Sequence, residues 1–316
     1  MFGKQKSVAF YYGVIILVVI LWGIYPVVTN YLYNYYSPSI CSFFYYGVSA
    51  LTLLAIYFKK LKNLTKDCLK TAVLTGLVMG VANVTIKIGL FYTTPSNYAF
   101  LENLQMVFVP IVLFIMYRQK PSLITVFCSI MCVLGCACLC GIFEGFNVRV
   151  GDILCCIATI FFGISIAVTG NSVRKYDPCL FVMIQLAISA ILALLTSLAL
   201  NFIKINGAPI EPIKFSFDIT LIAISIVVAV IAGAICWALR TVALKHIDIN
   251  VYTIILAFSA IVTSVLSIIV GTDQLTTSLV IGASLIFASI VISGASDIIT
   301  QKRLEKSKEI DSNKND

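Results

Sequence analysis

Charged residues are scarce in this sequence. Asp, Glu, Lys and Arg make up 11% of the 316 residues, histidine occurs once, and 60% of the residues are hydrophobic. Average soluble domains carry about 25% charged residues, so this composition excludes an ordinary soluble fold. The mean hydropathy of +1.02 indicates a chain that lies largely within a membrane.

Motifs for catalysis and nucleotide binding are also missing. The sequence has no G-x-x-x-x-G-K-[ST] loop to hold nucleotide phosphates. Its single histidine, His246, has no partners in the sequence pattern for a zinc site or a catalytic triad. We therefore expect no enzyme activity, no cofactor and no nucleic-acid partner, and we assign the net charge of +8 to membrane topology.

Cysteines, by contrast, are numerous. Four of the eleven, Cys128, Cys132, Cys136 and Cys140, recur every four residues along one helix face. Thiolates bind soft metals, but the usual zinc spacing C-x-x-C is absent and thiols within apolar helices act as small packing residues. We expect packing here, with no metal site and no disulfide framework.

Long apolar runs fill most of the chain. About 20 helical residues cross a bilayer core about 30 Å thick, and the runs lack the alternation of a membrane β-barrel. This predicts an all-α membrane protein with ten spans. They are expected at Ala9–Thr29, Pro38–Phe58, Leu69–Leu90, Pro95–Tyr117, Ser122–Ile142, Val150–Ser172, Pro178–Ile203, Ile219–Leu244, Ile249–Val270 and Leu275–Ile298.

Basic residues collect on one side of this ten-span arrangement. Eighteen of the 22 Lys and Arg residues lie there, three lie on the other side, and Lys87 falls inside a span. The positive-inside rule then predicts a multi-pass cell-membrane protein with both termini in the cytoplasm. Residues 301–316 are polar and are expected to form a disordered cytoplasmic tail.

The chain also repeats itself. A shift of about 154 residues sets Gly89–Tyr98 over Ala243–Tyr252, and Gln119–Ser122 over Asp273–Thr276. We expect two repeats, residues 1–143 and 149–300, with five spans each. Because five is odd, the repeats would have opposite orientations, which is the architecture of many secondary transporters.

Several short motifs carry a family resemblance when taken in order. They are Leu21-Trp-Gly23, Phe43-Phe-Tyr-Tyr-Gly-Val-Ser-Ala50, Gly89-Leu-Phe-Tyr-Thr-Thr94, Ala243-Leu-Lys-His-Ile247 and Gly271-Thr-Asp-Gln-Leu-Thr276. With them the chain resembles the EamA branch of the drug/metabolite transporter superfamily. The resemblance implies a cavity between the halves, lined by spans one, three, four, six, eight and nine. It also implies transport of small metabolites such as amino acids, more commonly by export. The chain departs from the family pattern at Tyr45, Met106, Gln119, Ala260 and Asp273.

Three ionisable residues stand out because they lie well inside the predicted spans: Lys87, Glu102 and Arg240. Lys87 and Glu102 flank the turn at Thr94 by about seven residues each, so both are expected roughly 11 Å below the outer surface. They can form a structural salt bridge or contact a substrate, and the two roles are compatible. Arg240 either reaches the cytoplasmic surface with its long side chain or faces the cavity.

Helical spacing adds further candidates for a binding site. Asn83 shares a face with Lys87, Tyr98 and Gln105 share a face with Glu102, and aromatic residues recur on the opposing spans. The predicted substrate-binding residues are Trp22, Tyr25, Asn83, Lys87, Tyr98, Glu102, Gln105, Trp237, Arg240 and Tyr252. If Arg240 faces the cavity, two cations and one anion favour a small ligand that carries a carboxylate, for example an amino acid.

Other functions remain open at this point. A multidrug carrier or a carrier of phosphorylated metabolites could share the fold, and so could a passive channel or a non-transporting sensor. Glu102 could carry a coupling proton. The partners expected are a small-molecule substrate and the lipid bilayer, while the oligomeric state stays undecided and a monomer is compatible with the sequence.

Overall fold

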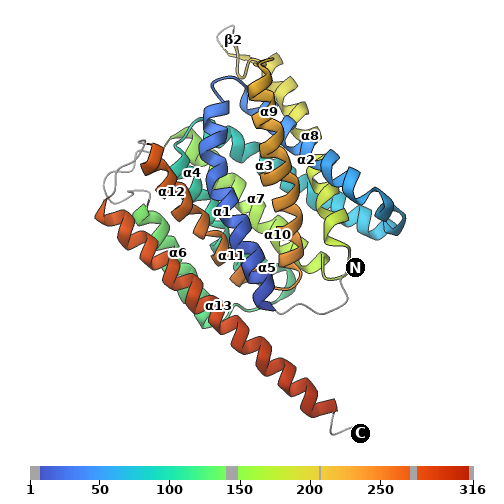
Figure 1. The fold of residues 1–316 in the computed structure, drawn as a ribbon, viewed down its shortest axis with the longest axis vertical. Coiled ribbons are helices and arrows are strands. Elements are labelled where there is room, and N and C mark those ends of the chain that lie inside the picture. The colour runs from blue at the N-terminus through green and yellow to red at the C-terminus, as the bar shows by residue number, and fades with distance from the viewer. Residues whose placement is uncertain (1–7, 140–148, 206–207, 271–275, 313–316) are drawn as a thin grey trace.

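The computed structural model describes residues 8–139, 149–205, 208–270 and 276–312, and nearly all of them are helical (Figure 1). In the first half the elements are α1 (Val8–Leu32), α2 (Pro38–Tyr57), the 3-10 helix η1 (Phe58–Asn63), α3 (Lys66–Phe91), α4 (Pro95–Asn103), α5 (Gln105–Tyr117) and α6 (Leu123–Leu139).

The second half follows the same plan, with two short strands between its second and third spans where the first half has η1. Its elements are α7 (Val150–Ser172), α8 (Pro178–Phe202), the short antiparallel strands β1 (Lys204–Ile205) and β2 (Ala208–Pro209), α9 (Ile219–Val228), the π-helix η3 (Ala229–Ile235), α10 (Cys236–Leu244), α11 (Ile249–Leu256), α12 (Phe258–Val270) and α13 (Thr277–Ser312).

The number of spans is close to the predicted ten. Within the described residues nine helices are long and apolar enough to cross a membrane, and a tenth apolar helix, Leu123–Cys138, is shorter. That helix belongs to the predicted fifth span, whose last residues lie outside the described part of the chain. An all-helical membrane protein is therefore confirmed, and ten full spans stay a prediction.

The expectation of a disordered tail is wrong for residues 301–312. α13 continues from the last span to Ser312 and extends well beyond the rest of the molecule (Figure 1). Residues 301–312 contain neither glycine nor proline and are rich in Gln, Lys, Arg, Leu and Glu, which are strong helix formers. Polarity alone does not predict disorder, because helical propensity allows a polar segment to extend a helix that is already nucleated.

Helices from the two halves pack against each other throughout the molecule. α3 packs along α7 and α8, α2 packs along α8, and α6 packs along α13. α1 contacts α10 and α12, while α7, its counterpart in the second half, contacts α3 and α5. The helices of one half thus take their main partners from the other half, and the interior lies between them.

Spans four and nine are each broken in the middle. Between α4 and α5, the Leu104 amide donates to Leu101 and the Val107 amide donates to Leu104, in the tighter 3-10 pattern. The same two bonds recur 153 residues later, at Ala257 and Ala260, where α11 ends and α12 begins. The repeat seen in the sequence therefore includes an interruption of the helix at equivalent places.

Span eight contains a π-helical segment that the sequence pattern does not reveal. In η3 the carbonyl oxygen of Ala232 accepts hydrogen bonds from Trp22 Nε1 at 2.8 Å and from the Tyr45 hydroxyl at 2.9 Å. The hydroxyl of Ser49 donates to the Ala229 carbonyl at 2.8 Å. A π-helix turns less per residue than an α-helix, so it changes which face of α10 looks inward.

Candidate functional site

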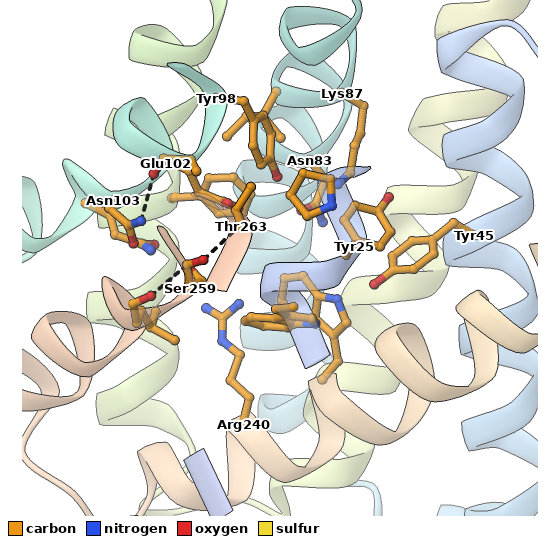
Figure 2. A pocket seen from close by; sticks show the side chains of 18 of the residues that line it. Tyr25, Tyr45, Asn83, Lys87, Tyr98, Glu102, Asn103, Arg240, Ser259 and Thr263 are labelled. Carbon is orange, nitrogen blue, oxygen red and sulfur yellow. Dashed lines mark hydrogen bonds between the residues drawn. The ribbon is translucent and has the colours of Figure 1, made fainter. Parts of the chain in front are cut away.

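The predicted site residues converge on one cavity (Figure 2). Nine of the ten line it; only Tyr252 does not. The lining comes from α1, α2, α3, α4, α5, α7, α10, α11 and α12. The predicted residues in the wall are Trp22, Tyr25, Asn83, Lys87, Tyr98, Glu102, Gln105, Trp237 and Arg240.

Lys87 lies on α3 and is 4% exposed. Its Nζ is 3.8 Å from the centroid of the Tyr25 ring and within 6 Å of the rings of Tyr45 and Tyr98. Aromatic faces attract a cation by about 2 kcal/mol or more when water is largely removed. Tyrosine rings from three helices thus hold the ammonium group.

A salt bridge between Lys87 and Glu102, one of the two roles expected for them, is not formed. Among the described residues, the ion pair that lies within 4.0 Å is Lys60 with Asp177, on the surface. Lys87 and Glu102 nevertheless line the same cavity, as their matched depth predicted. The physical reason is that the tyrosine rings satisfy the ammonium, so the carboxylate is not needed to neutralise it.

Arg240 faces the interior and does not reach the surface. It is 7% exposed, and its guanidinium carbon lies 4.4 Å from the Trp237 ring and 5.2 Å from the Trp22 ring. Figure 2 shows it entering the cavity from the end opposite Tyr98 and Glu102. Two indole rings close to the guanidinium attract its charge, which explains why the side chain does not extend to the surface.

Tyr252 lies close to Arg240 on the side away from the cavity. The ring is fully buried and its centroid is 5.8 Å from the Arg240 guanidinium carbon, yet it is outside the cavity wall. Tyr252 follows the N-cap Asp248 of α11, so it lies one helical turn into span nine. It can position Arg240 without touching a ligand.

Asn83 has a structural partner as well as a place in the wall. Its amide nitrogen donates to the Ser189 hydroxyl of α8 at 2.9 Å, and its Oδ1 has no hydrogen-bond partner. The glycines on the same face of α3, Gly76 and Gly80, pack closely on α8. This face therefore serves helix packing along most of its length and becomes part of the cavity at Asn83 and Lys87.

Several lining residues were missed. Span two contributes Tyr45 and Tyr46, and span nine contributes Ser259 and Thr263. The Phe43–Ala50 motif lies in span two, but in the sequence it indicates only the family and not a place in the site. Ser259 and Thr263 are four residues apart, the spacing of one helix face, and that signal was available.

The sequence matches the model of the EamA-like transporter family over residues 9–141 and again over residues 149–295. The two matches cover most of the chain. The chain belongs to the EamA-like transporter family. It is therefore a multi-pass membrane protein of a transporter family, built from two EamA-like repeats, as the motif order indicated.

Two further comparisons give proteins that are similar to this chain. A protein of Archaeoglobus fulgidus described as an uncharacterized transporter is 25% identical over 205 residues, which are 65% of this chain and 62% of that protein. A solved structure described only as the crystal structure of a protein matches with a TM-score of 0.71 at 11% identity, covering 92% of this chain and 99% of that one. At that identity the second match shows the fold alone.

Proposed function

We propose that this EamA-like transporter is a secondary carrier of a small polar metabolite that bears a carboxylate, such as an amino acid, and that it works by export or exchange. The observation that carries the proposal is the cavity itself. It holds the cations of Lys87 and Arg240 and the carboxylate of Glu102, with no ion pair within 4.0 Å among these three described residues. Charged groups inside a membrane protein mark substrate and ion pathways.

The charges favour an anionic group on the ligand. Two cations and one carboxylate leave the wall with one excess positive charge, and a ligand carboxylate can supply the missing anion. The guanidinium of Arg240 presents a planar set of donors that fits a carboxylate in bidentate geometry. An ammonium group on the ligand can meet Glu102, while the aromatic side chains contact its apolar part.

Two features near the cavity bear on alternating access. An apolar cluster that includes Ile15, Val18, Leu113, Ile166 and Leu244 lies toward the side predicted to be cytoplasmic. A second pocket adjoins the cavity and shares Tyr25 and Tyr45 with it. We infer that the cluster closes the cytoplasmic end in this conformation, and that the inverted repeats open one end as the other closes.

Glu102 is the candidate for proton coupling. It is the one carboxylate in the cavity wall, and it faces the same space as both cations. We expect Glu102→Gln to retain the fold and to remove the pH dependence of uptake into proteoliposomes, because the amide cannot take up or release a proton. Unchanged pH dependence in Glu102→Gln would show that the coupling proton, if there is one, binds elsewhere.

The rival functions make different demands on the same cavity. A carrier of cationic drugs would place its ligand beside the uncompensated charge of Arg240, which is unfavourable, whereas a phosphorylated metabolite would suit that arginine. A channel or a sensor would not show saturable exchange of labelled substrate across a vesicle membrane. The class of ligand and the kinetics therefore separate the candidates.

The test combines ligand screening with exchange. Purified protein is heated with amino acids, organic acids, phosphorylated sugars, nucleosides and quaternary amines, because a ligand that binds only the folded state raises the melting temperature. We expect carboxylates to raise it and to show counterflow in liposomes. Arg240→Met should weaken binding by about tenfold or more, while Lys70→Met, an exposed lysine on α3, should not. Stabilisation by quaternary amines or phosphorylated sugars but not by carboxylates would reject the proposed substrate class.

A further inference from the structure

A second concave site lies on the outer surface of the helical bundle, between α5 and α6. Its wall is almost entirely apolar. Val107, Ile111 and Phe114 form the side on α5, and Ile130 and Leu134 form the side on α6. None of these residues belongs to the wall of the central cavity.

The groove exists because α6 packs elsewhere. α6 lies along α13 over its length and makes few contacts with α5 (Figure 1). Pro110 in α5 has no amide hydrogen, so the Met106 carbonyl one turn earlier loses its helical donor; the Ser129 hydroxyl of α6 takes that place at 3.4 Å. The two helices thus touch at this hydrogen bond, and the short connection between them lies at the other end of the groove.

That other end is basic. Lys120 lines the groove, Arg118 precedes it by two residues, and both side chains are exposed. Arg118 has a left-handed backbone, with φ of 58°, and caps α5, so the chain turns there and begins α6 at Leu123. The N-terminus of α6, where a helix carries partial positive charge, lies at this same end. The positive-inside rule places the end at the cytoplasmic surface.

We propose that this groove is a binding site for an anionic phospholipid of the cytoplasmic leaflet, with an acyl chain along α5 and α6 and the phosphate at Lys120. α5 has 13 residues and is therefore roughly 20 Å long, which is enough to line one leaflet of a core about 30 Å thick. The exposed fractions of Ile111 (49%) and Leu134 (48%) are those of side chains that face hydrocarbon. Basic pockets between spans on the cytoplasmic side are suited to anionic head groups.

The site is independent of the proposed substrate. The groove borders α5 just after the break at Leu104, where span four bends. A lipid seated there packs on the half of span four that follows the break and holds α6 apart from α5.

Native mass spectrometry of the full chain tests the proposal. The protein is transferred from vesicles that contain equal amounts of phosphatidylglycerol and phosphatidylcholine, and the retained lipids are counted. We expect phosphatidylglycerol to be retained in preference. Lys120→Ala should weaken its retention about fivefold, since one basic residue near the surface contributes about 1 kcal/mol. Lys62→Ala, at an exposed lysine in η1 outside the groove, should retain it as the wild type does.

A second pair of variants tests the apolar part of the groove. Ile130→Trp fills it and should displace the bound lipid, whereas Leu195→Trp, at an exposed position on α8, should not. Both substitutions lie on the lipid-facing surface, so the fold is expected to survive. Equal retention of the two lipids by the wild type would overturn the proposal. So would equal effects of Lys120→Ala and Lys62→Ala, or a lipid-free dimer that Ile130→Trp dissociates, which would identify a second copy as the occupant.

Discussion

Lys87 carries its charge in an environment where charge is costly. The side chain is 4% exposed in the middle of the molecule, and its partners are tyrosine rings, the nearest at 3.8 Å. A buried charge without an ionic partner is costly, so a lysine that served stability alone would be paired with a carboxylate. Replacing buried ions by apolar groups of similar size is often neutral or stabilising, so stability alone gives no reason to keep a lysine here. An ammonium held by rings stays available to a ligand anion.

This leads to a prediction that separates function from stability. We expect Lys87→Met to abolish substrate-induced stabilisation and transport, while the free energy of unfolding without ligand stays within about 1 kcal/mol of wild type or rises. Thermal melts in detergent, with and without ligand, measure both effects, and Lys70→Met serves as the matched control on the same helix. If Lys87→Met instead lowered the free energy of unfolding without ligand by about 3 kcal/mol or more, Lys87 would have a structural role.

At the scale of helices, the cavity depends on the close contact between α1 and α12. A Cβ atom at Gly23 would fall on the side chain of Val262 and 3.1 Å from the carbonyl oxygen of Ser259. The Thr263 hydroxyl also donates to the Gly23 carbonyl at 2.8 Å. These contacts hold α12, which carries Ser259 and Thr263, against α1 at Gly23, so the shape of the cavity wall depends on the absence of a side chain at Gly23.

Adding one methyl group there should therefore disturb both stability and binding. We expect Gly23→Ala to lower the free energy of unfolding by about 1–3 kcal/mol, as overpacking does, and to weaken ligand binding. Gly13→Ala is the control on the same helix, since nothing lies within 4 Å of the Cβ position at Gly13. Alanine favours a helix over glycine, so Gly13→Ala should be as stable as wild type or slightly more so. Equal melting temperatures for the two variants would contradict this prediction.

The start of α8 depends on a carboxylate outside the membrane. Asp177 Oδ1 accepts a hydrogen bond from the Cys179 amide at 2.9 Å, and Oδ2 pairs with Lys60 at 3.0 Å. Burial by itself would raise the pKa of Asp177, but the hydrogen bonds from Lys60 and the amides outweigh it and lower the pKa below its usual value. The charged form is therefore preferred in the folded protein.

A carboxyl whose pKa is lowered on folding stabilises the protein above its unfolded pKa, and this contribution is lost as the pH falls through the folded pKa. We expect Asp177→Ala to lower the free energy of unfolding by about 1 kcal/mol at neutral pH, and the difference from wild type to narrow below about pH 4. Asp177→Asn keeps the cap and loses only a partly exposed ion pair, so it should cost about 0.5 kcal/mol or less. Melting curves between pH 7 and pH 3 check the order, and a pH-independent difference would contradict it.

For the whole molecule, the orientation in the membrane is the property that connects the cavity to a direction of transport. The distribution of Lys and Arg predicts that η1 lies in the cytoplasm and the β1–β2 segment outside. In the proposed mechanism the apolar cluster that contains Ile15 and Leu244 then closes the cytoplasmic end, and the pocket that shares Tyr25 with the cavity lies toward the outside.

Cysteine labelling in intact cells tests this orientation. We expect a membrane-impermeant maleimide to label Lys204→Cys before permeabilisation and Lys62→Cys only afterwards, because both positions are exposed but lie on opposite sides. Wild-type protein gives the background, and the described native cysteines are buried or half-buried. Labelling of Lys62→Cys in intact cells would invert the topology and with it the assignment of the closed end.

The sequence by itself determined the membrane fold, the repeats and most of the candidate site. Crossing the hydrocarbon core takes about 20 apolar helical residues, so the spans can be recognised from the sequence alone. Lys87, Glu102 and Arg240 are conspicuous in the sequence because ionisable residues are rare inside membrane spans. Depth in the membrane follows from counting residues along a helix, which is why Lys87 and Glu102 were correctly expected to face one cavity.

Only the tertiary structure decided which partners these residues meet. It placed tyrosine rings from α1, α2 and α4 around Lys87 in place of Glu102, and two indole rings beside Arg240. It also brought Tyr45 into the wall, where its hydroxyl donates to a carbonyl oxygen of the π-helix η3. These contacts join residues up to about two hundred positions apart, and they depend on how helices rotate and bend on packing, which periodicity along a single helix does not specify.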